Sequence, residues 1–211
     1  MKNRKDYIAD KNLFDKDLEG LSLKMLEQHY KLYEGYVKKS NEIQIKVESA
    51  DKSEANGVYS FIGELKRQET FAVNGMKLHE VYFGHLQGDG KPAGELLAMI
   101  EKDWGSLDEW KNEMIATGMS ARGWAITAFD YRDNRLHVYG SDGHNVGAVW
   151  GAAPVIVLDV YEHAYFIDYG IGRKAYIDSF FKNLDWNFAN KIALEYGLAA
   201  RYGKLHEQNG A

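Results

Sequence analysis

The sequence predicts an α+β fold, with helices through the first half of the chain and a small sheet flanked by helices in the second half. Apolar residues recur at helical spacing over much of residues 21–119. Two β-rich segments, 123–131 and 135–140, are joined by a short turn. The apolar run 154–159 predicts a third strand, and helical patterns return after it.

The first half is predicted to contain two long helical regions. The first covers about residues 21–39, with Ser22 as a candidate N-cap. The polar residues 40–52 give no firm signal. The second covers about residues 56–86 and is expected to break near Gly75, because glycine weakens a helix locally.

Shorter elements are predicted beyond this region. The glycine-rich loop 86–95 leads into amphipathic helices at about 94–104 and 107–119, and Ser106 is a candidate cap for the second. After the strands, helices are expected near 162–169, 174–182 and 186–200. Residues 1–17 read as a charged arm, and the chain ends in a polar tail.

Composition narrows the possible chemistry. The net charge of −5 argues against a general nucleic-acid binder, which needs a basic face to neutralise phosphates. The absence of cysteine excludes disulfides, zinc ribbons, iron–sulfur clusters and cysteine nucleophiles. Any metal ion must therefore be held by histidine, aspartate or glutamate.

Targeting signals are not evident in the sequence. The segment MKNRKDYIADKNLF lacks the apolar core of a signal peptide, and no apolar run reaches the length of a membrane-spanning helix. We therefore expect a cytoplasmic protein that binds neither membrane nor nucleic acid.

Two histidines lie on predicted helices beside candidate site residues. His29 is seven residues before Tyr36, about two helical turns, so both side chains point to one face. His79 follows Gly75 by one turn, on a face where glycine removes bulk. From spacing alone, packed core histidines are the favoured explanation for both. His137, on a strand, and His206, in the tail, are expected to face water.

Asp159 and His163 form the strongest local pattern. Asp159 ends the apolar run of the third strand, and a buried aspartate is uncommon unless it is paired or binds a metal. His163 lies four residues later. A structural ion pair or a helix cap is possible, but an aspartate and a neutral imidazole at this spacing also suit iron or manganese.

Several segments resemble one known family. The segment DVYEHAYFIDYGIGRKAYIDSFFKNLDW resembles the C-terminal signature of the iron/manganese superoxide dismutases, usually D-x-W-E-H-A-Y-Y. LEQHYKLYEGYV and NGMKLHEVYF are similar to the first and second helices of that family, which each carry a ligand histidine. ARGWAITAFD and DGHNVGAVWGAAPVIVLD also resemble family segments. The resemblance covers about residues 18–190.

The resemblance implies a fold, a cofactor and a reaction. An N-terminal helical hairpin domain (1–88) is expected to precede a C-terminal α/β domain (89–211) with a small three-stranded antiparallel sheet. One Fe or Mn ion per subunit, with a solvent molecule as fifth ligand, would disproportionate superoxide to dioxygen and hydrogen peroxide. The implied protein ligands are His29, His79, Asp159 and His163. A homodimer, possibly a tetramer, is also implied.

The family pattern also assigns roles around the metal. Since Gly75 has no side chain, His144 is expected to supply the hydrogen bond that tunes the bound solvent. Tyr36 would be the gateway tyrosine beside the substrate path. Glu162 would reach across a dimer interface to the ligand histidine of the other subunit. Aromatic walls are expected from Trp124, Trp150 and Tyr161.

Four positions depart from the common family pattern. Tyr36 follows His29 by seven residues rather than eight, and Tyr161 replaces a tryptophan. Tyr33 stands where the family has a second histidine on the first helix, and Phe166 stands where it has a tyrosine. The polar link that this pair makes across the dimer is therefore expected to be absent or rebuilt. Because the chain is acidic, steering of an anionic substrate must be local. The candidates for that steering are Lys31 and Arg173.

Two other functions remain open from the sequence. One is a non-catalytic relative that keeps the fold as a structural or interaction module, although such relatives usually lose ligands. The other is a different metal oxidoreductase or a metal hydrolase. Zinc at catalytic sites prefers fewer protein ligands plus water, so the identity of the bound metal would discriminate.

Overall fold

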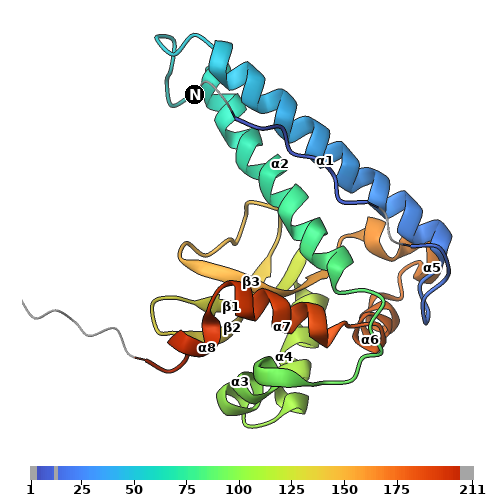
Figure 1. Cartoon of the computed structure of the whole chain (residues 1–211). Coiled ribbons are helices and arrows are strands. Elements are labelled where there is room, and N and C mark those ends of the chain that lie inside the picture. Colours follow the sequence, from blue (N-terminus) through green and yellow to red (C-terminus); the bar gives the residue numbers. More distant parts are fainter. Residues whose placement is uncertain (1–3, 12–13, 205–211) are drawn as a thin grey trace, which may run out of the picture.

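Two long helices, α1 (Leu23–Ser49) and α2 (Phe61–Gly84), run side by side and project from the rest of the molecule (Figure 1). The computed structural model describes residues 4–11 and 14–204. The predicted cap is confirmed, because the Ser22 side chain accepts a hydrogen bond from the backbone N–H of Met25.

Helix α1 extends ten residues beyond its predicted end at residue 39. The extension buries Ile43 and Gln44 on the side facing α2, and Glu42 pairs with Lys39 and Lys46 at one-turn spacing on the outside. Most of these residues are polar, so the apolar stripe that reveals a helix in sequence is too sparse here.

Helix α2 begins at residue 61 rather than 56 and is unbroken at Gly75, so the predicted break is wrong. Glycine costs about 1 kcal/mol in a helix interior relative to alanine. Buried side chains on both sides of Gly75 offset this cost, among them Ala72, Met76 and Leu78.

The next two helices, α3 (Gly94–Trp104) and α4 (Leu107–Ser120), match the prediction closely. Gly105 ends α3 in the left-handed conformation, with φ of 81°, which glycine adopts without a steric penalty. The Ser106 side chain accepts from the N–H of Glu109, as expected of an N-cap.

Three antiparallel strands form the sheet, in the order β2-β1-β3. They are β1 (Trp124–Asp130), β2 (Arg135–Ser141) and β3 (Ala152–Asp159). Register places Trp124 opposite Asp159, at the end of the sheet that faces the helical hairpin. Helix α4 packs against β1 and β2, whereas α2 contacts β3.

Two of the three predicted C-terminal helices are divided into shorter elements. A 3-10 turn (Glu162–Ala164) and α5 (Phe166–Tyr169) replace the helix expected over 162–169. Helix α6 (Arg173–Lys182) agrees with the prediction. The segment 186–200 forms two helices, α7 (Trp186–Glu195) and α8 (Leu198–Arg201), because Gly197 between them is left-handed, with φ of 64°.

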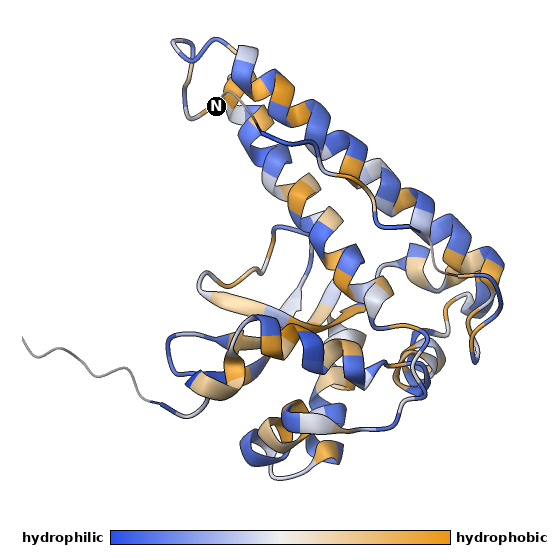
Figure 2. Cartoon of the chain, in the orientation of Figure 1, coloured by the Kyte–Doolittle hydropathy of each residue, from blue (hydrophilic) through white to orange (hydrophobic). Residues whose placement is uncertain are grey.

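The main core lies between the sheet and the helices of the second half, joined by the lower ends of α1 and α2 (Figure 2). Residues 4–11 of the N-terminal arm lie against the helical hairpin, where Tyr7 exchanges backbone hydrogen bonds with the Asn41 side chain. Across residues 4–11 and 14–204, no helix has both the length and the apolar character to cross a membrane. His206 lies outside the described residues.

Candidate metal centre

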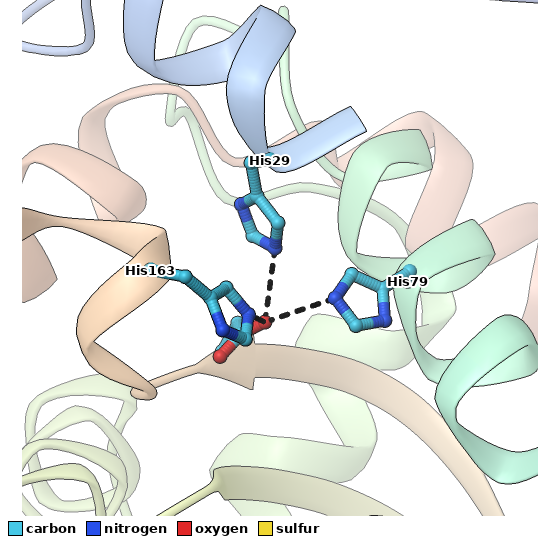
Figure 3. A group of neighbouring side chains, drawn as sticks. His29, His79 and His163 are labelled. Carbon is cyan, nitrogen blue, oxygen red and sulfur yellow. Dashed lines mark hydrogen bonds and ion pairs between the residues drawn. The ribbon is translucent and has the colours of Figure 1, made fainter. Parts of the chain in front are cut away.

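Three imidazoles converge on one carboxylate oxygen where the hairpin meets the sheet (Figure 3). His29 Nε2 and His163 Nε2 each lie 3.1 Å from Asp159 Oδ2, and His79 Nε2 lies 3.5 Å from the same atom. The histidines come from α1, α2 and the 3-10 turn after β3, and Asp159 is the last residue of β3. Three segments far apart in sequence thus meet at one point.

The orientation of His79 indicates that a cation belongs in the cluster. Its Nδ1 lies 2.6 Å from the Gly75 carbonyl oxygen, which can only accept, so Nδ1 carries the proton. In the neutral ring Nε2 is then a lone pair, and it has no hydrogen-bond partner among the described residues. It faces a carboxylate oxygen, also an acceptor, and a metal ion between them satisfies both.

Burial keeps two of the three histidines neutral, whereas at His163 the attraction of Asp159 outweighs burial and raises the imidazole pKa above its ordinary value. Burial lowers the pKa of His79 to about 3 and also lowers the pKa of His29. Burial alone would raise the pKa of Asp159, but His163 and His29 outweigh it and hold that carboxyl well below its usual range. Neutral imidazoles and an ionised carboxylate are the forms that bind metals.

The donor set fits iron or manganese. The four ligand atoms lie within 4.8 Å of one another, and three of the four residues are buried. Imidazole suits iron, and carboxylate suits manganese. His163, with 25% of its side chain exposed, is the ligand candidate nearest the surface.

Asp159 is also held from behind. Its Oδ1 accepts from the backbone N–H of Tyr161 at 2.9 Å, so only Oδ2 faces the histidines. The Tyr176 hydroxyl donates to the Asp159 carbonyl oxygen at 2.7 Å, and the Tyr82 hydroxyl lies 3.1 Å from that of Tyr176. Sequence reasoning missed both tyrosines. Tyr82 shares a helix face with His79, which was an available signal, but nothing in the sequence marks Tyr176.

Beside the cluster, His144 connects Trp124 to Tyr36. Trp124 Nε1 donates to His144 Nδ1 at 3.0 Å, and His144 Nε2 lies 2.8 Å from Tyr36 Oη. Burial lowers the pKa of His144 to about 4 and raises that of Tyr36 to about 12, so both are neutral at pH 7. The Tyr36 and His79 rings are 5.3 Å apart, which places this chain of groups next to the cluster.

Gly75 makes the room that His144 and Tyr36 occupy. A Cβ at this position would lie 3.0 Å from Tyr36 Cδ1 and 3.1 Å from His144 Cδ2. Asn74 holds the loop that carries His144, donating from its side chain to the His144 carbonyl oxygen at 3.0 Å. Asn74 was not a candidate in the sequence.

Two of the three aromatic residues expected to wall the site contact its histidines, and the third does not. Trp124 meets His79 edge-on with ring centres 5.1 Å apart, and Tyr161 stacks on His163 at 5.1 Å. Trp150 is 96% exposed, so the expectation that it walls the site within this chain is wrong. It sits in the loop before β3, which carries its side chain to the surface instead.

The residues expected near a dimer interface differ in their burial within the chain. Tyr33 is buried, and its hydroxyl accepts from the backbone N–H of Asp10 at 2.8 Å and donates to Glu80 at 3.0 Å. It therefore ties the N-terminal arm to α2. Glu162 and Phe166 are exposed beside His163.

The two steering candidates also differ. Lys31 is exposed and lines a groove between α1 and α2 that reaches Tyr36. The Arg173 guanidinium instead donates to the Ala121 and Gly118 carbonyl oxygens, at 2.8 and 3.3 Å, and lies over the Tyr165 ring. It therefore holds the end of α4 and is not free to move towards a substrate.

Comparison with known sequences agrees with this picture. Residues 92–192 match the family described as iron/manganese superoxide dismutases, C-terminal domain. The "Superoxide dismutase [Fe]" of Aquifex pyrophilus is 47% identical over 193 residues, covering 89% of this chain and 88% of the relative. That of Cupriavidus metallidurans is 40% identical, covering 87% and 92%. The "Superoxide dismutase [Mn] 1" of Haloferax volcanii is 34% identical, covering 86% and 92%.

These matches, together with the cluster, identify a metal-dependent oxidoreductase. The chain belongs to the iron/manganese superoxide dismutase family. Its relatives include proteins named for each of the two metals.

Proposed function

We propose that this protein disproportionates superoxide to dioxygen and hydrogen peroxide at one iron or manganese ion per subunit. The proposed ligands are His29, His79, Asp159 and His163. The observation that carries the proposal is the convergence of their four ligand atoms within 4.8 Å, at a site where burial lowers the pKa of His29 and His79. The bound ion would supply the one-electron redox couple that both half-reactions need.

The chain's own residues would prepare the site for this chemistry. Tyr161 and Tyr176 hold Asp159 in place, and the Gly75 carbonyl fixes the tautomer of His79. Trp124 and Tyr161 pack on the histidine rings and exclude water from them. Tyr36 would stand beside the substrate path, within reach of the groove that Lys31 lines.

A homodimer, or a tetramer built from it, is the proposed assembly. Glu162 is exposed beside His163, and three exposed apolar side chains follow it within nine residues, namely Phe166, Ile167 and Ile171. Exposed apolar side chains close together in the chain favour a protein–protein interface. We propose that Glu162 reaches the ligand histidine of a second copy and orients it.

The assignment of the ligands also favours a division of the chain into two domains, and the composition favours a cytoplasmic antioxidant role. His29 and His79 come from the proposed hairpin domain, residues 1–88, whereas Asp159 and His163 come from residues 89–211. The metal would thus join the two domains. The composition, without cysteine, is compatible with a reducing compartment.

Elemental analysis of the purified protein together with a superoxide-decay assay tests the function. We expect about one iron or manganese ion per chain and decay that scales with metal content. A protein loaded with either metal in turn, and inactive with both, would be a non-catalytic relative instead.

Light scattering at several protein concentrations tests the assembly. We expect a dimer or tetramer for the unmodified chain and weaker association for Glu162→Ala. The matched control Glu195→Ala changes a glutamate on α7, and its assembly should be unchanged.

A further inference from the structure

Both ring nitrogens of His144 take part in hydrogen bonds whose direction can be deduced. An indole N–H only donates, so the Trp124 contact at 3.0 Å requires a lone pair on His144 Nδ1. An imidazole without a proton on Nδ1 must carry its proton on Nε2. That N–H points at Tyr36 Oη, 2.8 Å away, and is donated to it.

We propose that Trp124 is a positioning residue that fixes this tautomer of His144, leaving the imidazole no N–H for a solvent molecule at the metal. The Tyr36 hydroxyl accepts the hydrogen bond from His144 and still has its own hydrogen to donate. It is therefore the last donor in the series Trp124, His144, Tyr36. Tyr36, rather than His144, then tunes the bound solvent. This inference rests on the proposed function and names which side chain of that site performs the tuning.

The surroundings prevent the His144 ring from turning over and exchanging its nitrogens with its carbons. Two hydrogen bonds fix the loop that carries His144 to helix α2. The Asn74 side chain donates to the His144 carbonyl oxygen, and the Asn145 side chain donates to Thr70 Oγ1 at 2.8 Å. The ring itself packs against Phe71, with ring centres 4.5 Å apart. The ring also contacts Tyr161, with ring centres 5.2 Å apart.

Glutamine is not equivalent to histidine at this position. A glutamine amide has one oxygen and two N–H donors. At residue 144 its oxygen can accept from Trp124, and one N–H can serve Tyr36. The second N–H remains free for the bound solvent. His144→Gln is therefore expected to add a donor that the natural residue lacks.

The added donor has a predictable effect on the reduction potential. An oxidised ion held by these residues would carry more charge and would favour hydroxide over water as its solvent ligand, and hydroxide accepts a hydrogen bond more strongly. A further donor therefore stabilises the oxidised state. We expect the midpoint potential of His144→Gln to fall relative to the unmodified protein.

Nitrogen NMR of the full-length, metal-free chain tests the tautomer. The chain is labelled in histidine and tryptophan, and the His144 signals are assigned by their loss in His144→Gln. We expect a proton on Nε2 and a coupling through the hydrogen bond between Trp124 Nε1 and His144 Nδ1. In Trp124→Phe the Nδ1–H form should appear. A proton on Nδ1 in the unmodified chain overturns the proposal, and that result does not depend on whether Trp124→Phe folds.

Redox titration of the metal-loaded protein tests the consequence. His137→Gln is the matched control, because His137 lies on β2 and pairs with Asp133 instead. The control should leave the potential unchanged, whereas an unchanged or raised potential in His144→Gln overturns the proposal. Superoxide decay on the same samples separates the two claims. The expected tautomer in an inactive metal-loaded protein refutes the proposed function alone, and the wrong tautomer in an active protein refutes this inference alone.

Discussion

His79 Nε2 and Asp159 Oδ2 lie 3.5 Å apart in the protein interior, and both are acceptors. The proton of His79 is used on its other nitrogen, in the bond to the Gly75 carbonyl. Two facing acceptors repel unless a cation lies between them. This pair therefore distinguishes a metal site from an ordinary buried ion pair, in which the imidazole would donate.

Replacing Asp159 by asparagine should abolish metal retention. The substitution removes the only charged ligand and places an amide among three imidazoles. Loss of an outer partner of a metal ligand already costs 10–100-fold in affinity, so loss of a ligand should cost about 100-fold or more. Elemental analysis and calorimetric titration with the metal measure the effect. Asp133→Asn, which changes a surface aspartate paired with His137, should retain the metal.

Substituting two helical glycines by alanine should have opposite effects on stability. Gly75→Ala would place Cβ against Tyr36 and His144 and should lose about 1–2 kcal/mol net, after the helix-propensity gain. Gly35→Ala, on the exposed face of α1 with no atom within 4 Å of the new Cβ, should gain about 0.5–1 kcal/mol. Denaturant unfolding measures both, and a stabilised Gly75→Ala would show that the space is not needed.

Tyr33→Phe should loosen the N-terminal arm without affecting the metal. The change removes the hydrogen bonds to Asp10 and Glu80, for an expected loss of about 1–2 kcal/mol. Limited proteolysis should cut the arm faster, while metal content stays the same. Tyr59→Phe, at a tyrosine that is 71% exposed, serves as the control and should change neither.

The metal-free protein should lose stability as the pH falls below about 6.5, partly through His85. Burial lowers the pKa of His85 to about 3 in the folded state, whereas in the unfolded chain it is near the ordinary value of 6.5. Between these two pKa values the unfolded state binds one more proton than the folded state. This residue therefore lowers the free energy of unfolding by up to about 1.4 kcal/mol for each unit by which the pH falls.

His85→Leu isolates this contribution. It should flatten the pH dependence of unfolding between pH 6 and 4, with little change in slope above pH 7. His137→Leu, at a partly exposed histidine, is the comparison. Equal slopes for His85→Leu and the unmodified chain would contradict the assignment.

Local patterns were sufficient to predict most of the fold. Ser22 and Ser106 act as the predicted caps, and the three strands lie where apolar alternation and the short turn place them. The last ten residues of α1 were missed, since their buried face includes Ser40 and Gln44 beside Ile43 and gives too sparse an apolar stripe. Helix formation there depends on packing against α2, which no local pattern reports.

The residues that form the site were predicted, but the contacts between them were not. Resemblance to the family named the four clustered residues, yet Gly75 was expected to break a helix and instead makes space for two side chains. The directions of the His144 hydrogen bonds depend on Trp124, twenty residues away in sequence. Such relationships arise only after the sheet and the hairpin have met, so residue spacing alone cannot reveal them.

The separation of His29 and Asp159 along the chain, 130 residues, has a consequence for biosynthesis. An ion bound by both acts as a reversible cross-link that closes a very long loop, which by chain-entropy arithmetic constrains the unfolded state by about 4–5 kcal/mol. The cross-link cannot form until His163 has left the ribosome. The complete ligand set is therefore available only late in the synthesis of the chain, after more than three quarters of it has been made.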